Sequence, residues 1–165
     1  MSIIDDAGSV VPFGSTFVRA GAALVNKAVD DVFNLTGDAT RQSVVNIYNR
    51  TDNPIFFVDA SFDSGGFTTG KVAPFQIDGK TANAYRVESH GVGTGVTGAH
   101  IRYAFSQPVQ GADPEVVLDI NTSNPFAGSN HAEVQAFNAE GVNFNTVNRV
   151  SVGDSNEVDI DFFTS

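Results

Sequence analysis

Short stretches of alternating apolar and polar residues, separated by turn residues, constrain the fold of this chain most strongly. The last stretch is the clearest, because Val158, Ile160 and Phe162 alternate with Asp159 and Asp161. A period of two places one set of side chains on one face of a sheet and the other set on the opposite face. Regularly spaced short strands with turns between them are typical of a β-sandwich. We therefore expect a mainly β fold.

The strands that this pattern predicts follow one another within residues 43–165. They cover residues 43–48, 54–62, 71–77, 82–89, 99–106, 115–120, 132–137 and 145–152, followed by the strand that contains Val158. Asp78-Gly79 between the third and fourth predicts a hairpin turn. Phenylalanine occurs 14 times and tryptophan is absent, so we expect many phenylalanines, Phe137 and Phe162 among them, to fill the core.

A single amphipathic segment, residues 16–33, precedes the strands. At 100° per residue its apolar side chains gather on one side of a helix. The stripe comprises Phe17, Val18, Leu24, Val25, Ala28, Val29, Val32 and Phe33. Thr16 can cap the first turn, and Gly37-Asp38 supplies a stop. We expect a helix over residues 16–34 that packs on the sheet and whose stripe also suits a lipid interface. Residues 1–15 are expected to be a flexible lead-in.

The charge balance excludes several classes of partner. The 165 residues include 19 acidic and 9 basic side chains, which gives a formal net charge of −10. Nucleic acid binding needs clustered Lys and Arg, and anionic lipid also attracts basic surfaces, so neither is expected. A zwitterionic lipid headgroup is compatible with this charge, because it carries no net charge itself. We expect a soluble protein, because no apolar run is long enough to span a bilayer as a helix and no signal peptide is recognisable.

The motifs that commonly carry chemistry are weak or absent. Residues 93–98 match G-x-G-x-x-G but run into a strand instead of opening a helix, so a flexible loop is expected. The three histidines lack zinc-site spacing, and the chain has no cysteine. Asp159 and Asp161 share one strand face, and a solvated face is favoured over a calcium site. We expect no enzyme activity, no metal and no cofactor, because no nucleophile, base or carboxylate pair converges.

Several motifs follow one another in the order of a known family. They are residues 20–66 (AGAALVNKAVDD through FDSGG), residues 93–106 (GTGVTGAHIRYAFS), then Ser123-Asn124-Pro125-Phe126, Asn130 and the strand 134–137. In order and spacing the chain resembles the actinoporins, the sea-anemone type of pore-forming cytolysin. The resemblance implies a β-sandwich whose N-terminal helix detaches, inserts into the membrane and lines a pore with neighbouring protomers. That role falls on residues 16–33, within a single domain over residues 16–165.

The same resemblance implies a lipid headgroup site. Ser64, Ser123 and Pro125 match its serines and proline, and His100 stands where the family usually has valine. The family's aromatic loop is reduced here to Ala127-Gly128-Ser129. Tyrosine and tryptophan hold choline by cation–π contact, so an altered lipid choice is implied.

Three phenylalanines offer alternative apolar anchors for that site, although a place in the core is favoured for each. They are Phe67, Phe126 and Phe144.

Two functions remain open at this point. The first is a pore-forming protein that binds sphingomyelin or another zwitterionic lipid. It would be a monomer or small oligomer in solution, be released from the producing cell and oligomerise on a target membrane. The second is a non-lytic, lectin-like module that binds a glycan or headgroup while the helix stays packed, because similar sandwiches occur in fungal fruit-body lectins.

Overall fold

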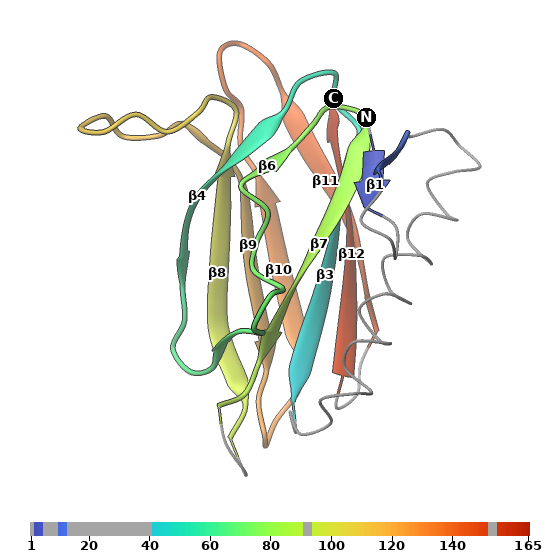
Figure 1. The fold of residues 1–165 in the computed structure, drawn as a ribbon, viewed down its shortest axis with the longest axis vertical. Coiled ribbons are helices and arrows are strands. Elements are labelled where there is room, and N and C mark those ends of the chain that lie inside the picture. Colours follow the sequence, from blue (N-terminus) through green and yellow to red (C-terminus); the bar gives the residue numbers. More distant parts are fainter. Residues whose placement is uncertain (1, 5–9, 13–40, 91–93, 152–154) are drawn as a thin grey trace.

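The computed structural model describes residues 2–4, 10–12, 41–90, 94–151 and 155–165, which form a mainly β fold (Figure 1). The strands are β1 (Ser2–Ile4), β2 (Val10–Pro12), β3 (Gln42–Asn49), β4 (Ile55–Ser61), β5 (Gly66–Phe67), β6 (Gln76–Ile77), β7 (Thr81–Glu88), β8 (Val96–Ala104), β9 (Val116–Asn124), β10 (His131–Ala136), β11 (Phe144–Ser151) and β12 (Ser155–Thr164). The predicted helix over residues 16–34 lies outside the described residues. The flexible lead-in over residues 1–15 stays a prediction.

The strands form two sheets that pack face to face (Figure 1). Sheet A has seven strands in the order β11-β12-β3-β7-β1-β2, with β5 paired to β7. Sheet B has the order β10-β9-β8-β4-β6. Strands β12 and β3 pair in parallel. On their other sides, β12 pairs antiparallel with β11, and β3 pairs antiparallel with β7. The predicted sandwich is therefore confirmed, with a parallel pair at the centre of sheet A.

The core forms where the apolar faces of the two sheets meet. Its fully buried side chains come from alternate positions, such as Ile101 and Tyr103 on β8 and Val158 and Ile160 on β12. Phe144 stacks on Phe162 with ring centroids 5.1 Å apart, an offset arrangement that aromatic pairs favour. The apolar alternation seen in the sequence thus decides which face of each strand is buried.

Three predicted features differ from the structure. The strand expected over residues 71–77 is limited to β6 (Gln76–Ile77). Phe137, expected in the core, is 41% exposed at the end of β10. Asp78-Gly79 does not close a hairpin, because β6 pairs with β4 in sheet B whereas β7 pairs with β3 in sheet A. The turn carries the chain from one sheet to the other. Gly79 packs so closely on the backbone of Asp52 that a Cβ atom would overlap it, which explains the glycine.

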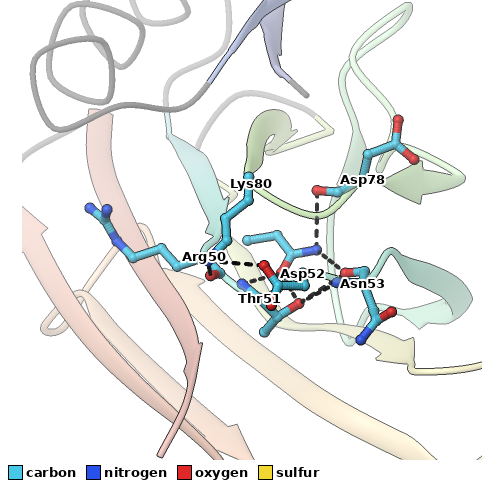
Figure 2. Close-up of polar contacts among 7 residues, drawn as sticks. Arg50, Thr51, Asp52, Asn53, Asp78 and Lys80 are labelled. Carbon is cyan, nitrogen blue, oxygen red and sulfur yellow. Dashed lines mark hydrogen bonds and ion pairs between the residues drawn. The ribbon is translucent and has the colours of Figure 1, made fainter.

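A buried asparagine, Asn49, organises this crossing between the sheets. Figure 2 labels its partners Thr51, Asn53 and Asp78. The Nδ2 group of Asn49 donates to the carbonyl oxygens of Asn53, Ile77 and Asp78 at 2.8, 3.0 and 3.1 Å. Its Oδ1 atom accepts from the backbone N–H and the hydroxyl of Thr51 at 3.1 and 2.7 Å. Asn49 is fully buried, so one side chain satisfies carbonyls from two chain segments that would otherwise lie unpaired.

A second set of buried polar side chains joins the sheets at the opposite end. Asn124, the last residue of β9 in sheet B, donates to the carbonyl of Gln42 at 2.8 Å and to Oδ1 of Asn156 at 3.4 Å. The hydroxyl of Ser43 donates to the same Asn156 oxygen. Asn124, Asn156 and Ser43 are all fully buried. Each end of β3 is therefore tied to sheet B through asparagine hydrogen bonds.

Replacing Asn49 with alanine should lower the free energy of unfolding by about 3 kcal/mol or more. The change removes several hydrogen bonds and leaves buried carbonyls unpaired, and each such carbonyl costs about 1–3 kcal/mol. Asn53→Ala is the matched control, because Asn53 contributes only backbone atoms and should change stability by less than about 0.5 kcal/mol. Urea unfolding measures both variants, and equal losses would contradict the role given to Asn49.

Two buried tyrosines should respond differently to replacement with phenylalanine, because only one of their hydroxyl groups is hydrogen-bonded. The hydroxyl of Tyr103 donates to the carbonyl of Pro74 at 3.0 Å, whereas the buried hydroxyl of Tyr85 has no hydrogen-bond partner among the described residues. Burial raises the pKa of both phenols, so both stay protonated. Tyr103→Phe should destabilise the protein by about 1 kcal/mol, and Tyr85→Phe should be neutral or stabilising. A loss of stability in Tyr85→Phe would reveal a partner such as a buried water.

Candidate functional site

Ser64 extends the edge of sheet B past the end of β4. Its backbone forms an isolated bridge with Thr97, through N–H···O distances of 3.2 and 3.1 Å. Its hydroxyl donates to the carbonyl of Gly95 at 2.9 Å and lies 3.0 Å from the hydroxyl of Thr97. The side chain of Ser64 is therefore bonded to Gly95, just before β8, and lies against Thr97 at its start.

Ser123 and Pro125 approach the same residues of β8 from the other side. The register between β8 and β9 shifts between Val96 and Ala99, and within this bulge the N–H of Gly98 donates to the hydroxyl of Ser123 at 3.0 Å. A Cβ atom on Gly95 would lie 2.5 Å from the Cα atom of Pro125. The structure thus gathers Ser64, Ser123 and Pro125, three of the four predicted headgroup residues, around residues 95–98.

His100, the fourth predicted residue, lies further along β8 on the outer face of sheet B. Its Nδ1 atom is 3.3 Å from Oδ1 of Asp119 on β9. Arg102, two residues on, donates from Nε to Asp59 at 2.7 Å, and this hydrogen bond lowers the pKa of the Asp59 carboxyl group. His100 therefore lies in a row of polar side chains, with Asp119, Arg102 and Asp59, beside the serine cluster.

An exposed aromatic ring and a guanidinium group complete this end of the sandwich. Phe126 follows Pro125 and is 51% exposed, so the preference for a core position is wrong at Phe126. The Arg41 guanidinium carbon lies 5.8 Å from the centroid of the Phe126 ring, and its Nη2 atom donates to the Phe126 carbonyl at 3.1 Å. This geometry is a cation–π contact reinforced by a hydrogen bond. Phe144, by contrast, is buried, and Phe67 packs against the core.

The pairing of Arg41 with Phe126 was not found from the sequence, because 85 positions separate the two residues. The only local signal is the turn composition around Phe126, with Pro125 before it and Ala127-Gly128-Ser129 after it. Asp63 adds a carboxylate to the same end. It is exposed, and a Cβ atom on Gly98 would overlap it. Gly98 has a φ of 54°, a conformation that favours glycine.

The acidic residues of β12 were the other candidates for a ligand site. Asp159 and Asp161 share a face, as predicted, but they are largely engaged with protein groups. Asp159 accepts from Asn46 at 2.8 Å, and Asp161 accepts from Arg50 at 2.6 Å and from Arg149 at 3.1 Å. The described residues contain no group of three or more His, Asp or Glu side chains that could hold a metal ion.

No protein-family model and no curated protein sequence matches the chain. Solved structures do share its fold. The lipid-binding protein Nakanori aligns with a TM-score of 0.61 at 15% identity, over 84% of this chain and 78% of Nakanori. RahU, solved in complex with a Tris molecule, aligns with a TM-score of 0.61 at 9% identity, over 78% of this chain and 98% of RahU. IP-1A from Alcaligenes faecalis aligns with a TM-score of 0.53 at 13% identity, over 77% of this chain and 93% of IP-1A.

These similarities confirm the predicted β-sandwich fold. Among the residues that the structure describes, no helix has the length and apolarity to cross a bilayer.

Replacing Gly95 with alanine tests whether close packing builds this site. The added Cβ atom would meet backbone atoms of residues 124–126, which cannot rotate away, so we expect a loss of about 2 kcal/mol or more. Gly111→Ala is the control. Gly111 has a φ of 83° but no atom within 4 Å of an added Cβ, so only the left-handed backbone cost of about 1 kcal/mol applies. A milder effect at Gly95 than at Gly111 in urea unfolding would contradict the packing.

Proposed function

We propose that this protein binds lipid headgroups at a membrane surface, through the end of the sandwich that carries Ser64, Ser123, Pro125, Arg41 and Phe126. The exposed ring of Phe126 carries the proposal. Arg41, directly before β3, contacts this ring and bonds the Phe126 carbonyl. An exposed aromatic ring on a loop can enter the interfacial region of a bilayer. The shared fold with Nakanori, a lipid-binding protein, supports the same role.

The charges of this end favour a zwitterionic headgroup, such as that of sphingomyelin. The carboxylate of Asp63 suits an ammonium or choline group, and the guanidinium of Arg41 suits a phosphate. A net charge of −10 disfavours a strongly anionic surface. The hydroxyls of Ser64 and Ser123 are bonded to backbone atoms of residues 95–98, so their main contribution is to shape the floor of the site.

We further propose that the segment of residues 16–33 inserts into the bilayer after binding and assembles with other protomers into a pore. The apolar stripe from Phe17 to Phe33 supports this step, because such a stripe can exchange a protein surface for a lipid interface. Membrane binding and pore formation are separate steps. Dye release from vesicles reports pore formation, whereas adsorption to the vesicle surface alone releases no dye.

The outer face of sheet B favours a second candidate function, the binding of a glycan without lysis. His100, Asp119 and Arg102 with Asp59 form rows of polar groups on this face, and such groups can bond sugar hydroxyls. We propose that neither function involves catalysis. The register places Ser61 opposite His100, but within the described part of the chain no hydrogen bond joins their side chains, so a nucleophile is not activated there.

Phe126→Ser should weaken binding to vesicles that contain sphingomyelin about tenfold or more, because transfer of a phenylalanine side chain from water contributes roughly 1.5–3 kcal/mol. Phe137→Ser is the matched control. Phe137 is also an exposed phenylalanine, but it lies at the opposite end of β10, so binding should not change. Co-sedimentation measures binding, and dye release measures pore formation in the same vesicles.

The outcomes separate the candidate functions. Equal losses for the two variants would contradict a site at Phe126. Binding without dye release would support headgroup recognition and contradict the pore. A signal on a glycan array without any vesicle binding would replace the lipid proposal with the glycan proposal.

A further inference from the structure

An extended loop between β8 and β9 leaves the body of the molecule (Figure 1). We call residues 106–115 the arm. Its side chains are exposed except for the half-buried Pro114, and Val109 near its tip is 68% exposed. A turn closes the tip, with the N–H of Ala112 donating to the carbonyl of Val109 at 3.2 Å. A valine held this far from the protein core has no apolar neighbour of its own to bury it.

The base of the arm is anchored on both sides by one residue. The hydroxyl of Ser106 lies 3.5 Å from Oε1 of Glu140, and the N–H of Glu140 donates to Oε1 of Glu115 at 3.3 Å. Glu140 sits in the turn between β10 and β11, with a φ of 49°. These contacts hold the two ends of the arm together and direct its tip away from the molecule that carries it.

An exposed apolar patch lies beside the place where the arm begins. We define the β6 patch as Val72, Phe75 and Phe56. Val72 is 59% and Phe75 58% exposed, and the Phe75 ring stands edge-on to Phe56 with centroids 6.5 Å apart. The carbonyl of Phe75 accepts from the N–H of Phe57 at 2.8 Å, which fixes the segment to the edge of sheet B. Phe56 pairs with Ala104, the last residue of β8.

The arm and the β6 patch also differ in charge. The arm carries Asp113 and Glu115 and has no basic residue, whereas Lys71 precedes Val72 in the patch. In the described part of the chain, neither Asp113 nor Lys71 has a side-chain hydrogen bond or an ion pair. An apolar tip beside a carboxylate thus complements an apolar patch beside an ammonium group, within a single chain.

We propose that the β6 patch binds the arm of a second copy of this chain, so that two copies exchange arms across a two-fold axis. Val109 of each copy rests on Val72 and Phe75 of the other, and Asp113 faces Lys71. The two halves of the interface are present in every chain, and a two-fold arrangement uses each contact twice. The dimer forms in solution and does not depend on lipid binding.

Engineered cysteines test the exchange, because the chain contains none of its own. Val109→Cys and Phe75→Cys variants, mixed and oxidised, should form a disulfide-linked dimer. Val109→Cys mixed with Val147→Cys is the control, since Val147 is similarly exposed but lies on β11 in sheet A. A yield no higher than the control would overturn the proposal. So would a Val109→Cys/Phe75→Cys double variant that closes only an intramolecular bridge, because the arm would then fold onto its own patch.

Charge reversal provides an independent test of the same interface by analytical ultracentrifugation. Lys71→Glu and Asp113→Lys should each raise the dimer dissociation constant roughly tenfold, because like charges then meet at two symmetry-related contacts. The double variant restores opposite charges and should recover the wild-type constant. Additive weakening in the double variant, or a wild-type protein that stays monomeric up to millimolar concentration, would refute the arm exchange.

Discussion

Buried asparagine hydrogen bonds set how the two sheets of this protein lie against each other. Asn49 at the end of β3 bonds the turns that cross between the sheets, and Asn124 with Asn156 bonds the opposite end. The apolar core between these ends drives association of the sheets but is non-directional. Hydrogen bonds from buried amides add the direction, because they form in one arrangement of the sheets and a shift would break them in a medium of low dielectric.

The two ends of the sandwich present different surfaces. At one end, Asn124 directly precedes Pro125 and Phe126, and Gly95 packs beneath them. The proposed lipid site therefore rests on a tightly packed base, which reduces the entropy lost when a headgroup binds. At the other end, the arm and the β6 patch are exposed beside the start of β9. An arm-exchanged dimer would leave the end with Phe126 uncovered, so self-association and membrane binding are compatible.

The sequence predicted part of the side-chain cluster that we propose as the lipid site. The resemblance to actinoporins placed Ser64, Ser123 and Pro125 in one pocket, and the structure brings them together around residues 95–98. Arg41 was missed because its partner, Phe126, is remote in the chain. Phe126 itself was expected in the core because phenylalanine usually is, and composition does not reveal that this ring is exposed. The helix that would insert into the membrane stays a prediction from the pattern of residues 16–33.

The positions of the strands follow from the sequence alone, since alternation with a period of two is a property of neighbouring residues. Val158, Ile160 and Phe162 face the core for that reason. The partner of each strand was decided only in three dimensions. Asp78-Gly79 has the composition of a hairpin, yet the chain crosses to the other sheet there, and β12 pairs in parallel with β3. Strand pairing, the crossing and the exposure of Phe126 depend on contacts between distant residues, which local patterns do not encode.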